Sequence, residues 1–155
     1  MPFANSYEAP EGNRLLAMLP RRDFLRLAPS LEKVSLGIKT ILYEFQEPIE
    51  HVYFPIGGVI SLVVQMRSGE STEIATIGGE GMVGTPLVLG ARRSSMRVFS
   101  QVPGESLRLP AKEFRQELAR EGALYAVMQR YIQALMNQIS QTVACNQLHS
   151  VEQRM

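Results

Sequence analysis

The sequence predicts a mainly-β domain with flanking helices, arranged as an antiparallel sandwich, a jelly roll or a small barrel. Between about residues 34 and 109, short β-branched or aromatic runs alternate with breaks that contain Gly or Pro. Helical patterns stand before and after this region, and the last of them is roughly 30 residues long. The chain has 155 residues, of which 45% are apolar, which is enough for one compact domain with its own core.

The N-terminal part predicts two short helices at residues 13–32, after a polar and flexible segment at 1–12. Asn13 is a suitable N-cap for the first helix, because its side-chain oxygen can accept from free backbone N–H groups. Pro20 stands at the opening of the second helix, where its missing N–H costs little. The expected buried side chains are Leu15, Leu16, Leu19, Phe24, Leu25 and Leu27.

Six runs in the middle of the chain predict strands. They are TILYEF (40–45), HVYFPI (51–56), VISLVVQM (59–66), TEIATI (72–77), MRVFSQV (96–102) and SLRLP (106–110). Short strands at regular spacing, separated by turn residues, are typical of sandwiches, jelly rolls and small barrels. The segment RSGE (67–70) has the turn chemistry of a β-hairpin and joins the third and fourth runs.

The C-terminal part predicts two helices. Pro110 can occupy the first turn of residues 111–120, and after a break near Glu121 and Gly122 a second helix runs from about Ala123 toward the end. An apolar stripe of this helix has alternate spacings of four and three, typical of helix pairing; it consists of Met128, Ile132, Leu135, Ile139, Thr142 and Asn146. Val127, Tyr131, Ala134 and Val143 form a second face.

The length of this last helix predicts a homodimer. A helix of roughly 30 residues is about 45 Å long, which is more than a domain of this size can cover. One face is therefore expected to pack on the β domain and the other on a second copy of the chain. The alternative is a single amphipathic helix that lies across one sheet.

A glycine-rich segment, GGEGMVG (78–84), follows the strand TEIATI and matches G-x-G-x-x-G at Gly79, Gly81 and Gly84. A dinucleotide fingerprint also requires a helix after the glycines and an acidic residue about 20 positions later. Residues 82–95 are too short and too interrupted to form that helix, and residues 99–101 contain no acid. The segment is therefore not expected to bind a dinucleotide.

Four segments, taken in order, resemble the Crp/Fnr family of bacterial transcription regulators. They are LYEFQEPIEHVYFPIGGVISLV (42–63), EIATIGGEGMVGTPLVLG (73–90), QVPGESLRLPAKEFRQEL (101–118) and CNQLHSVEQRM (145–155). The resemblance implies a double-stranded β-helix, or jelly roll, of the cyclic-nucleotide-binding type at 13–120, with a phosphate-binding cassette between two strands. It also implies a long dimerisation helix at 121–155.

In this family a winged helix-turn-helix domain follows the dimerisation helix and binds DNA. The sequence ends at Met155, about where that domain would begin, as expected for an excised or a naturally shortened sensor domain. DNA binding is therefore expected only through a C-terminal domain that this sequence lacks. The implied function is effector sensing and dimerisation in a transcriptional regulator.

The resemblance also predicts that the cassette has lost the usual ligand chemistry. Cyclic-nucleotide-binding members carry Gly-Glu at its start, for the ribose hydroxyl, and Arg-Ser or Arg-Thr near its end, for the cyclic phosphate. These positions fall on Gly84 and Thr85, and near Ser95 and Met96, in this sequence. A buried phosphate without a charge-assisted donor is strongly disfavoured. Cyclic AMP is therefore not expected to bind in the usual way.

Several alternatives remain for the cassette region. The candidate ligand residues are Gly84, Thr85, Pro86, Leu87, Arg92, Arg93 and Arg97. The arginines can bind a small anionic effector together with backbone amides, including a cyclic nucleotide if they shift by one to three positions. They can instead form a solvated loop, or contact a macromolecule. A further alternative is a ligand-free dimerisation scaffold.

Two residues of the long helix, Ser140 and Thr142, lie near the stretch where cyclic-nucleotide-binding members contact the base. Small polar residues on a helix more often bond locally or face solvent. A cupin-type enzyme is the alternative from another class, because cupins share the jelly roll, but it needs inward His and Glu metal ligands that His51 and His149 do not supply.

Other chemistry is not indicated. No nucleophile–base pair or acid pair is evident, so the protein is not expected to be an enzyme and no catalytic residue is assigned. His51 and His149 lack the spacing of metal ligands, so no metal or cofactor is expected, and the effector is unknown. His51, which precedes a strand, is expected at the surface. Cys145 is expected to be buried as a small apolar residue, with redox pairing across a dimer as the alternative.

The single cysteine and the absence of a signal-peptide pattern predict a cytoplasmic protein. The formal net charge is +1, so no polycationic face is predicted, and the basic cluster ARRSSMR (91–97) is local. One cysteine cannot form a disulfide framework within the chain, as expected in a reducing compartment. No signal-peptide pattern or membrane-spanning apolar run is present, so no membrane association is expected.

Overall fold

The structure is a computed structural model that describes residues 12–154, with side chains described for residues 12–145. Three short helical elements come first: α1 (Arg14–Ala17), α2 (Arg21–Leu27) and the 3-10 helix η1 (Ala28–Ser30). The strands are β1 (Glu32–Leu36), β2 (Ile41–Tyr43), β3 (His51–Pro55), β4 (Val59–Gln65), β5 (Ser71–Ile77), β6 (Arg97–Val102) and β7 (Gly104–Pro110). The 3-10 helix η2 (Thr85–Leu89) lies between β5 and β6, and α3 (Ala111–Ala119) and α4 (Ala123–Arg154) follow β7.

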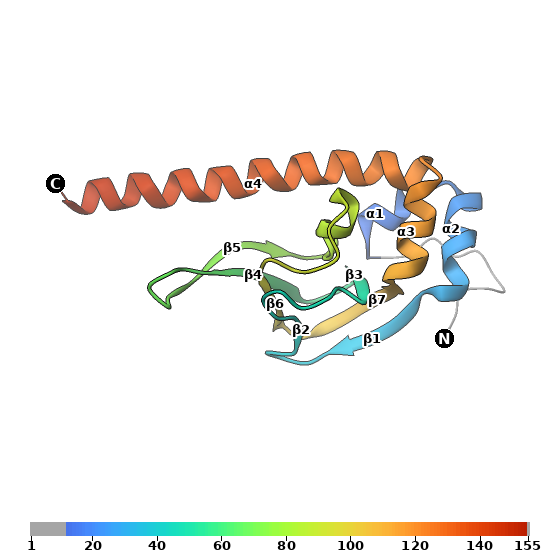
Figure 1. The fold of residues 1–155 in the computed structure, drawn as a ribbon, viewed down its shortest axis with the longest axis horizontal. Helices are drawn as coiled ribbons and strands as arrows, with labels where there is room; N and C mark the ends of the chain where they lie inside the picture. The colour runs from blue at the N-terminus through green and yellow to red at the C-terminus, as the bar shows by residue number, and fades with distance from the viewer. Residues whose placement is uncertain (1–11, 155) are drawn as a thin grey trace.

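The strands form two antiparallel sheets, which confirms the jelly roll. One sheet has the order β1-β7-β3, and an isolated bridge from Tyr53 to Val83 extends it by one segment. The other sheet has the order β2-β6-β4-β5. In Figure 1 the α1, α2 and α3 helices gather at one end of the two sheets, and the β4–β5 hairpin projects toward the other end.

The predicted hairpin is present between β4 and β5. The Met66 N–H donates to Glu70 O at 2.7 Å, and Gly69 adopts a φ of 91°. This conformation is easily reached only by glycine. The six predicted strand runs are all confirmed within a few residues at their ends.

The N-terminal caps are also as predicted, with one difference in extent. Asn13 Oδ1 accepts from the N–H groups of Leu15 and Leu16, each at 3.1 Å, and Pro20 precedes α2. The predicted helical segment ends earlier, because η1 stops at Ser30 and Glu32 begins β1. The sequence EKVSL pairs with β7 along all five of its residues, a long-range partnership that the local pattern does not reveal.

One core joins the helices to both sheets. The largest fully buried side chains are Phe24, Phe54, Phe114, Leu16, Ile77, Met82, Leu107, Leu109, Leu124, Met128, Val52 and Val83. Of the buried set predicted for the N-terminal helices, only Leu25 is half-buried instead. The Phe54 and Phe114 rings lie 6.4 Å apart between centroids, so α3 packs directly against β3.

An ion-pair network connects α2 with α3. Arg26 donates to both carboxylate oxygens of Glu117, with the shortest contact at 2.8 Å, and also pairs with Asp23 at 3.2 Å. The hydrogen bond to Glu117 raises the pKa of Arg26, although burial of the guanidinium opposes this. The network fixes the short N-terminal helices against the helix that leads into α4.

Helix α4 runs along the roll and continues beyond it (Figure 1). It contacts β5 and η2, and Leu124, Val127, Met128 and Leu135 are buried against the rest of the chain. Within the residues that the structure describes, no helix combines the length and apolarity that crossing a membrane would require.

Candidate functional site

The candidate site is the cassette that begins at Gly84 and includes η2. Gly84 has a φ of 111°, and a Cβ atom on it would lie 2.5 Å from Val52 Cγ1 and 3.2 Å from the Tyr43 hydroxyl. Both the left-handed backbone and the close approach to β3 therefore require glycine. Leu87 anchors η2 in the core, and Gly90, at a φ of 89°, ends the turn.

The start of the cassette carries no carboxylate. Thr85 and Pro86 are the first residues of η2, both half-buried, and the first turn has no acidic residue. Glu80, the nearest acid upstream, accepts a hydrogen bond from the Gly78 N–H at 3.0 Å. Its carboxylate thus stabilises the turn that precedes the cassette.

The arginines of the cluster turn toward the β2–β3 connection. Arg97 Nε donates to Glu44 Oε1 at 2.8 Å, and its guanidinium carbon lies 5.7 Å from the centre of the Phe45 ring. Arg93 donates to Gln46 O at 2.8 Å. These two guanidinium groups hold residues 44–46, while Arg92 is exposed.

Backbone bonds fix the same contact. Ser94 N–H donates to Glu47 O at 2.9 Å, Gln46 N–H donates to Ser94 O at 2.7 Å, and Pro48 bridges to Arg93. Ser94 is buried, and its hydroxyl bonds to Met96 O at 2.7 Å. The end of the cassette is therefore a loop that hydrogen bonds hold against residues 46–48.

A buried tyrosine that the sequence did not single out lies beside Gly84. Tyr43 is 3% exposed, and its hydroxyl donates to His51 O at 2.5 Å and approaches Val83 O at 3.5 Å. Burial raises the pKa of this phenol well above its ordinary value, with a smaller contribution from Tyr53. A lone Tyr in a strand pattern carries no signal for this position, because its partners are 8 and 40 residues away.

A second tyrosine connects α4 to the segment that enters the cassette. Tyr131 donates its hydroxyl hydrogen to Met82 O at 3.2 Å, and a Cβ atom on Gly81 would collide with that hydroxyl. Burial raises the pKa of Tyr131 to about 12, against the hydrogen bond to Met82, which lowers it. The sequence placed Tyr131 on the second apolar face of the helix, without this contact.

The other helix residues are distributed over several surfaces. Ser140 is exposed, and Thr142 bonds to Gln138 O at 3.0 Å, so both follow the local pattern of small polar residues. Of the predicted pairing stripe, Met128 and Leu135 are buried in the chain's own core, which removes them from the reach of a second chain. Ile132, Ile139 and Thr142 are half-buried, and the side chain of Asn146 lies outside the described residues.

Two further predictions are corrected by the structure. Cys145 is exposed on α4, because it lies beyond the part of the helix that the roll covers. His51 is half-buried at the start of β3 instead of fully exposed, and it lines a cavity together with residues of η1 and the end of β7. Among the residues with described positions, no group of three or more His, Cys, Asp or Glu side chains could hold a metal ion.

A family model agrees with this architecture. The cyclic nucleotide-binding domain family matches residues 33–121. This span contains the cassette, α3 and all seven strands, apart from the first residue of β1. The chain belongs to this family. A search of curated protein sequences found no match.

Solved structures of regulators share the fold. The catabolite activator protein of Thermus thermophilus is 13% identical, with a TM-score of 0.67 over 86% of this chain and 62% of that protein. The sensor domain of the transcriptional regulator DNR from Pseudomonas aeruginosa is 15% identical, with a TM-score of 0.64 over 80% of this chain and 83% of that domain.

A eukaryotic protein shares it as well. The regulatory subunit of a cAMP-independent protein kinase A from Trypanosoma brucei is 20% identical, with a TM-score of 0.67 over 77% of this chain. This chain spans 43% of the length of that subunit. At these identities the comparisons show the common fold.

Proposed function

We propose that this chain is the effector-sensing and dimerisation part of a Crp/Fnr-type transcriptional regulator, whose cassette does not bind cyclic AMP in the usual way. The observation that carries the proposal is the cassette itself. It keeps the fold position of a phosphate-binding element, yet Thr85 replaces the carboxylate, and Arg93 and Arg97 bond to residues 44–46. The activity is binding and conformational coupling, with no catalytic step.

Coupling between the cassette and α4 is supported by Tyr131. Its hydroxyl bonds to the carbonyl of Met82, two residues before Gly84, and its ring lies over Gly81. A movement of the cassette that displaces Met82 must therefore break this bond or move α4. Effector sensing would require this contact to have two arrangements, of which the effector favours one.

Dimerisation through α4 is supported by an apolar stripe on its outer side. Tyr125, Met136 and Val143 are 38%, 58% and 46% exposed, and the half-buried Ile132 and Ile139 lie between them in sequence. The spacings from Ile132 onward are four, three and four, which is the repeat of a two-helix seam. The stripe retains Ile132 and Ile139 from the predicted set and is rotated away from Met128 and Leu135.

The proposed assembly is a homodimer, with DNA bound only by a further C-terminal domain. Sedimentation equilibrium from 5 to 200 μM tests the dimer, and a species that stays monomeric throughout contradicts it.

A thermal-shift screen of small anions tests the effector site. An anion that raises the melting temperature of the wild type but not of Arg92→Gln supports an anionic effector at the cassette. If no anion in the screen changes the melting temperature, a ligand-free scaffold is favoured.

A further inference from the structure

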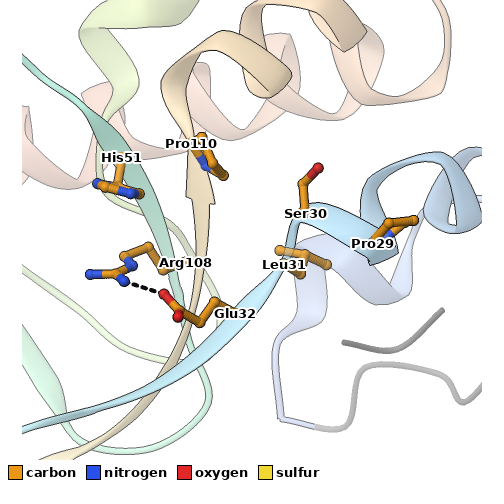
Figure 2. A pocket seen from close by; sticks show the side chains of 7 residues that line it. All are labelled: Pro29, Ser30, Leu31, Glu32, His51, Arg108 and Pro110. Carbon is orange, nitrogen blue, oxygen red and sulfur yellow. Dashed lines mark hydrogen bonds and ion pairs between the residues drawn. The ribbon is translucent and has the colours of Figure 1, made fainter. Parts of the chain in front are cut away.

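A cavity of about 390 Å³ opens between the start of β1 and the ends of β3 and β7 that adjoin it. Figure 2 shows His51 and Arg108 on one wall, and Pro29, Ser30 and Leu31 on the opposite wall. The cavity shares no residue with the cassette. It is within the size range of ligand pockets, roughly 300–1,000 Å³.

The polar groups around this cavity are mostly hydrogen-bond donors. Arg108 has five N–H groups and no acceptor, Ser30 has a hydroxyl, and a neutral His51 has one ring N–H. Burial and the charge of Arg108 lower the pKa of His51, against Glu50 and Glu32, which raise it, and this favours the neutral imidazole. Three donor-bearing residues therefore line the cavity together with a single carboxylate, that of Glu32.

Arg108 is held in place from both sides. It lies opposite Glu32 on β1 and opposite Tyr53 on β3, and hydrogen bonds to these residues raise its pKa, although burial opposes this. Its Nε is enclosed and has no hydrogen-bond partner. The guanidinium is thus a fixed positive group at the edge of the cavity.

Glu32, in contrast, can leave the cavity. Its side chain is 56% exposed, against 32% for Arg108, and the ion pair between them is the dashed contact in Figure 2. Exposed ion pairs contribute little to stability, because water and salt replace them at small cost. A ligand carboxylate can therefore take the place of the Glu32 carboxylate beside Arg108.

The remaining lining is apolar. Pro29, Leu31 and Pro110 offer surface to a small hydrocarbon group next to the charged edge. We propose that this cavity binds a small organic monocarboxylate, whose carboxylate replaces that of Glu32 beside Arg108 and whose apolar part lies against these three residues. The site is independent of the cassette and of the function proposed for it.

The probe is sodium benzoate, and the readout is the proton NMR signal of the His51 imidazole. The chain has two histidines, so a His149→Gln variant assigns the signal, and the His149 signal is an internal control. Benzamide, which has the same shape without the charge, is the control ligand, and sodium chloride matches the ionic strength. Benzoate is expected to shift the His51 signal saturably in the millimolar range, with no saturable shift from benzamide.

Two variants give opposite expectations. Glu32→Gln removes the competing carboxylate, so benzoate should bind about two- to fivefold more tightly. Arg108→Gln removes the charged donor, so binding should weaken at least about tenfold. If that variant does not fold, as judged by its melting curve, Arg108→Lys replaces it and should also weaken binding, since it lacks the planar fork.

Three results would overturn the proposal. The first is the absence of a saturable benzoate shift at His51 up to 50 mM. The second is an equal response to benzamide, which would assign the shift to apolar contact alone. The third is weaker binding by Glu32→Gln, which would mean that Glu32 supports the ligand instead of competing with it.

Discussion

Tyr131 is the residue that connects the cassette with the long helix. Its hydroxyl reaches a backbone carbonyl of the segment before Gly84, and the missing side chain of Gly81 makes room for its ring. The contact is half-buried, so the hydrogen bond is shielded from competing water. A net intramolecular hydrogen bond of this kind contributes about 0.5–1.5 kcal/mol.

Tyr131→Phe should lower the free energy of unfolding by about 1 kcal/mol at pH 8, because only the hydrogen bond to Met82 is lost. For a domain of this size the melting temperature should fall by about 2–4 °C. Thermal unfolding followed by circular dichroism measures both. Arg130→Ala is the control, because Arg130 is exposed on the same helix outside the apolar stripe proposed for dimerisation and should melt like the wild type.

The same variant should respond differently to alkaline pH. The pKa of Tyr131 is raised to about 12 in the folded protein, from an ordinary value of 10.0, so its stabilisation is complete below pH 10 and is lost as pH rises toward 12. Wild type should therefore lose stability faster than Tyr131→Phe between these values. Urea unfolding at pH 8 and pH 11 measures the free energy of unfolding of both proteins. If the difference between them is the same at the two pH values, the raised pKa of Tyr131 is contradicted.

Asn13 is a second residue with more than one role. Its carbonyl caps α1, and its amide nitrogen donates to Pro55 O and Gly81 O, each at 2.9 Å. Asn13→Ala should cost about 2–4 kcal/mol, because it removes a cap and leaves two buried carbonyls without a donor. Urea unfolding measures the loss. Arg14→Ala, at the exposed neighbouring position, should change stability by less than about 0.5 kcal/mol.

At the scale of elements, α4 has two apolar surfaces with different partners. One surface carries Leu124, Met128 and Leu135 and packs on the roll, and the other carries Met136 and Val143 in the open. The alternation of four and three in the sequence indicated a pairing helix, but it did not fix which stripe faces outward. The rotation depends on where β5 and η2 meet the helix, which is a tertiary property.

Met136→Glu should convert the proposed dimer to a monomer, because it places a charge at the centre of the outer stripe. Asn137→Glu adds the same charge to a neighbouring exposed position outside the stripe and should leave the dimer intact. Sedimentation velocity at 50 μM distinguishes the two variants. Equal sedimentation of both variants and the wild type would place the interface elsewhere.

Local patterns predicted most of the elements but not their long-range partners. The β4–β5 hairpin follows from RSGE and the cap of α1 follows from Asn13, since both depend on nearby residues. Strand β1 was missed, because EKVSL is recognisable only through its pairing with β7, about 70 residues later. In the same way, the absence of an acid at the start of η2 can be read from the sequence, whereas the bond from Arg97 to Glu44 spans 53 residues.

At the scale of the whole molecule, the two sheets, the cassette and α4 form one connected unit. The cassette lies on β3 through Gly84 and is joined to α4 through Tyr131, and the loop after it is braced on residues 44–47. Membership in the cyclic nucleotide-binding domain family describes this architecture. The proposed difference lies in its chemistry, because η2 begins without an acid and Arg93 and Arg97 bond to residues 44–46.

Calorimetric titration with cyclic AMP and cyclic GMP tests this difference most directly. With Thr85 at the cassette start and Arg97 bound to Glu44, we expect no saturable heat for either nucleotide up to about 1 mM, equivalent to binding weaker than about −4 kcal/mol. Arg97→Gln should leave that result unchanged. Micromolar binding by the wild type that is lost in a folded Arg97→Gln protein would contradict the account, because it would show that this arginine leaves Glu44 to hold the phosphate.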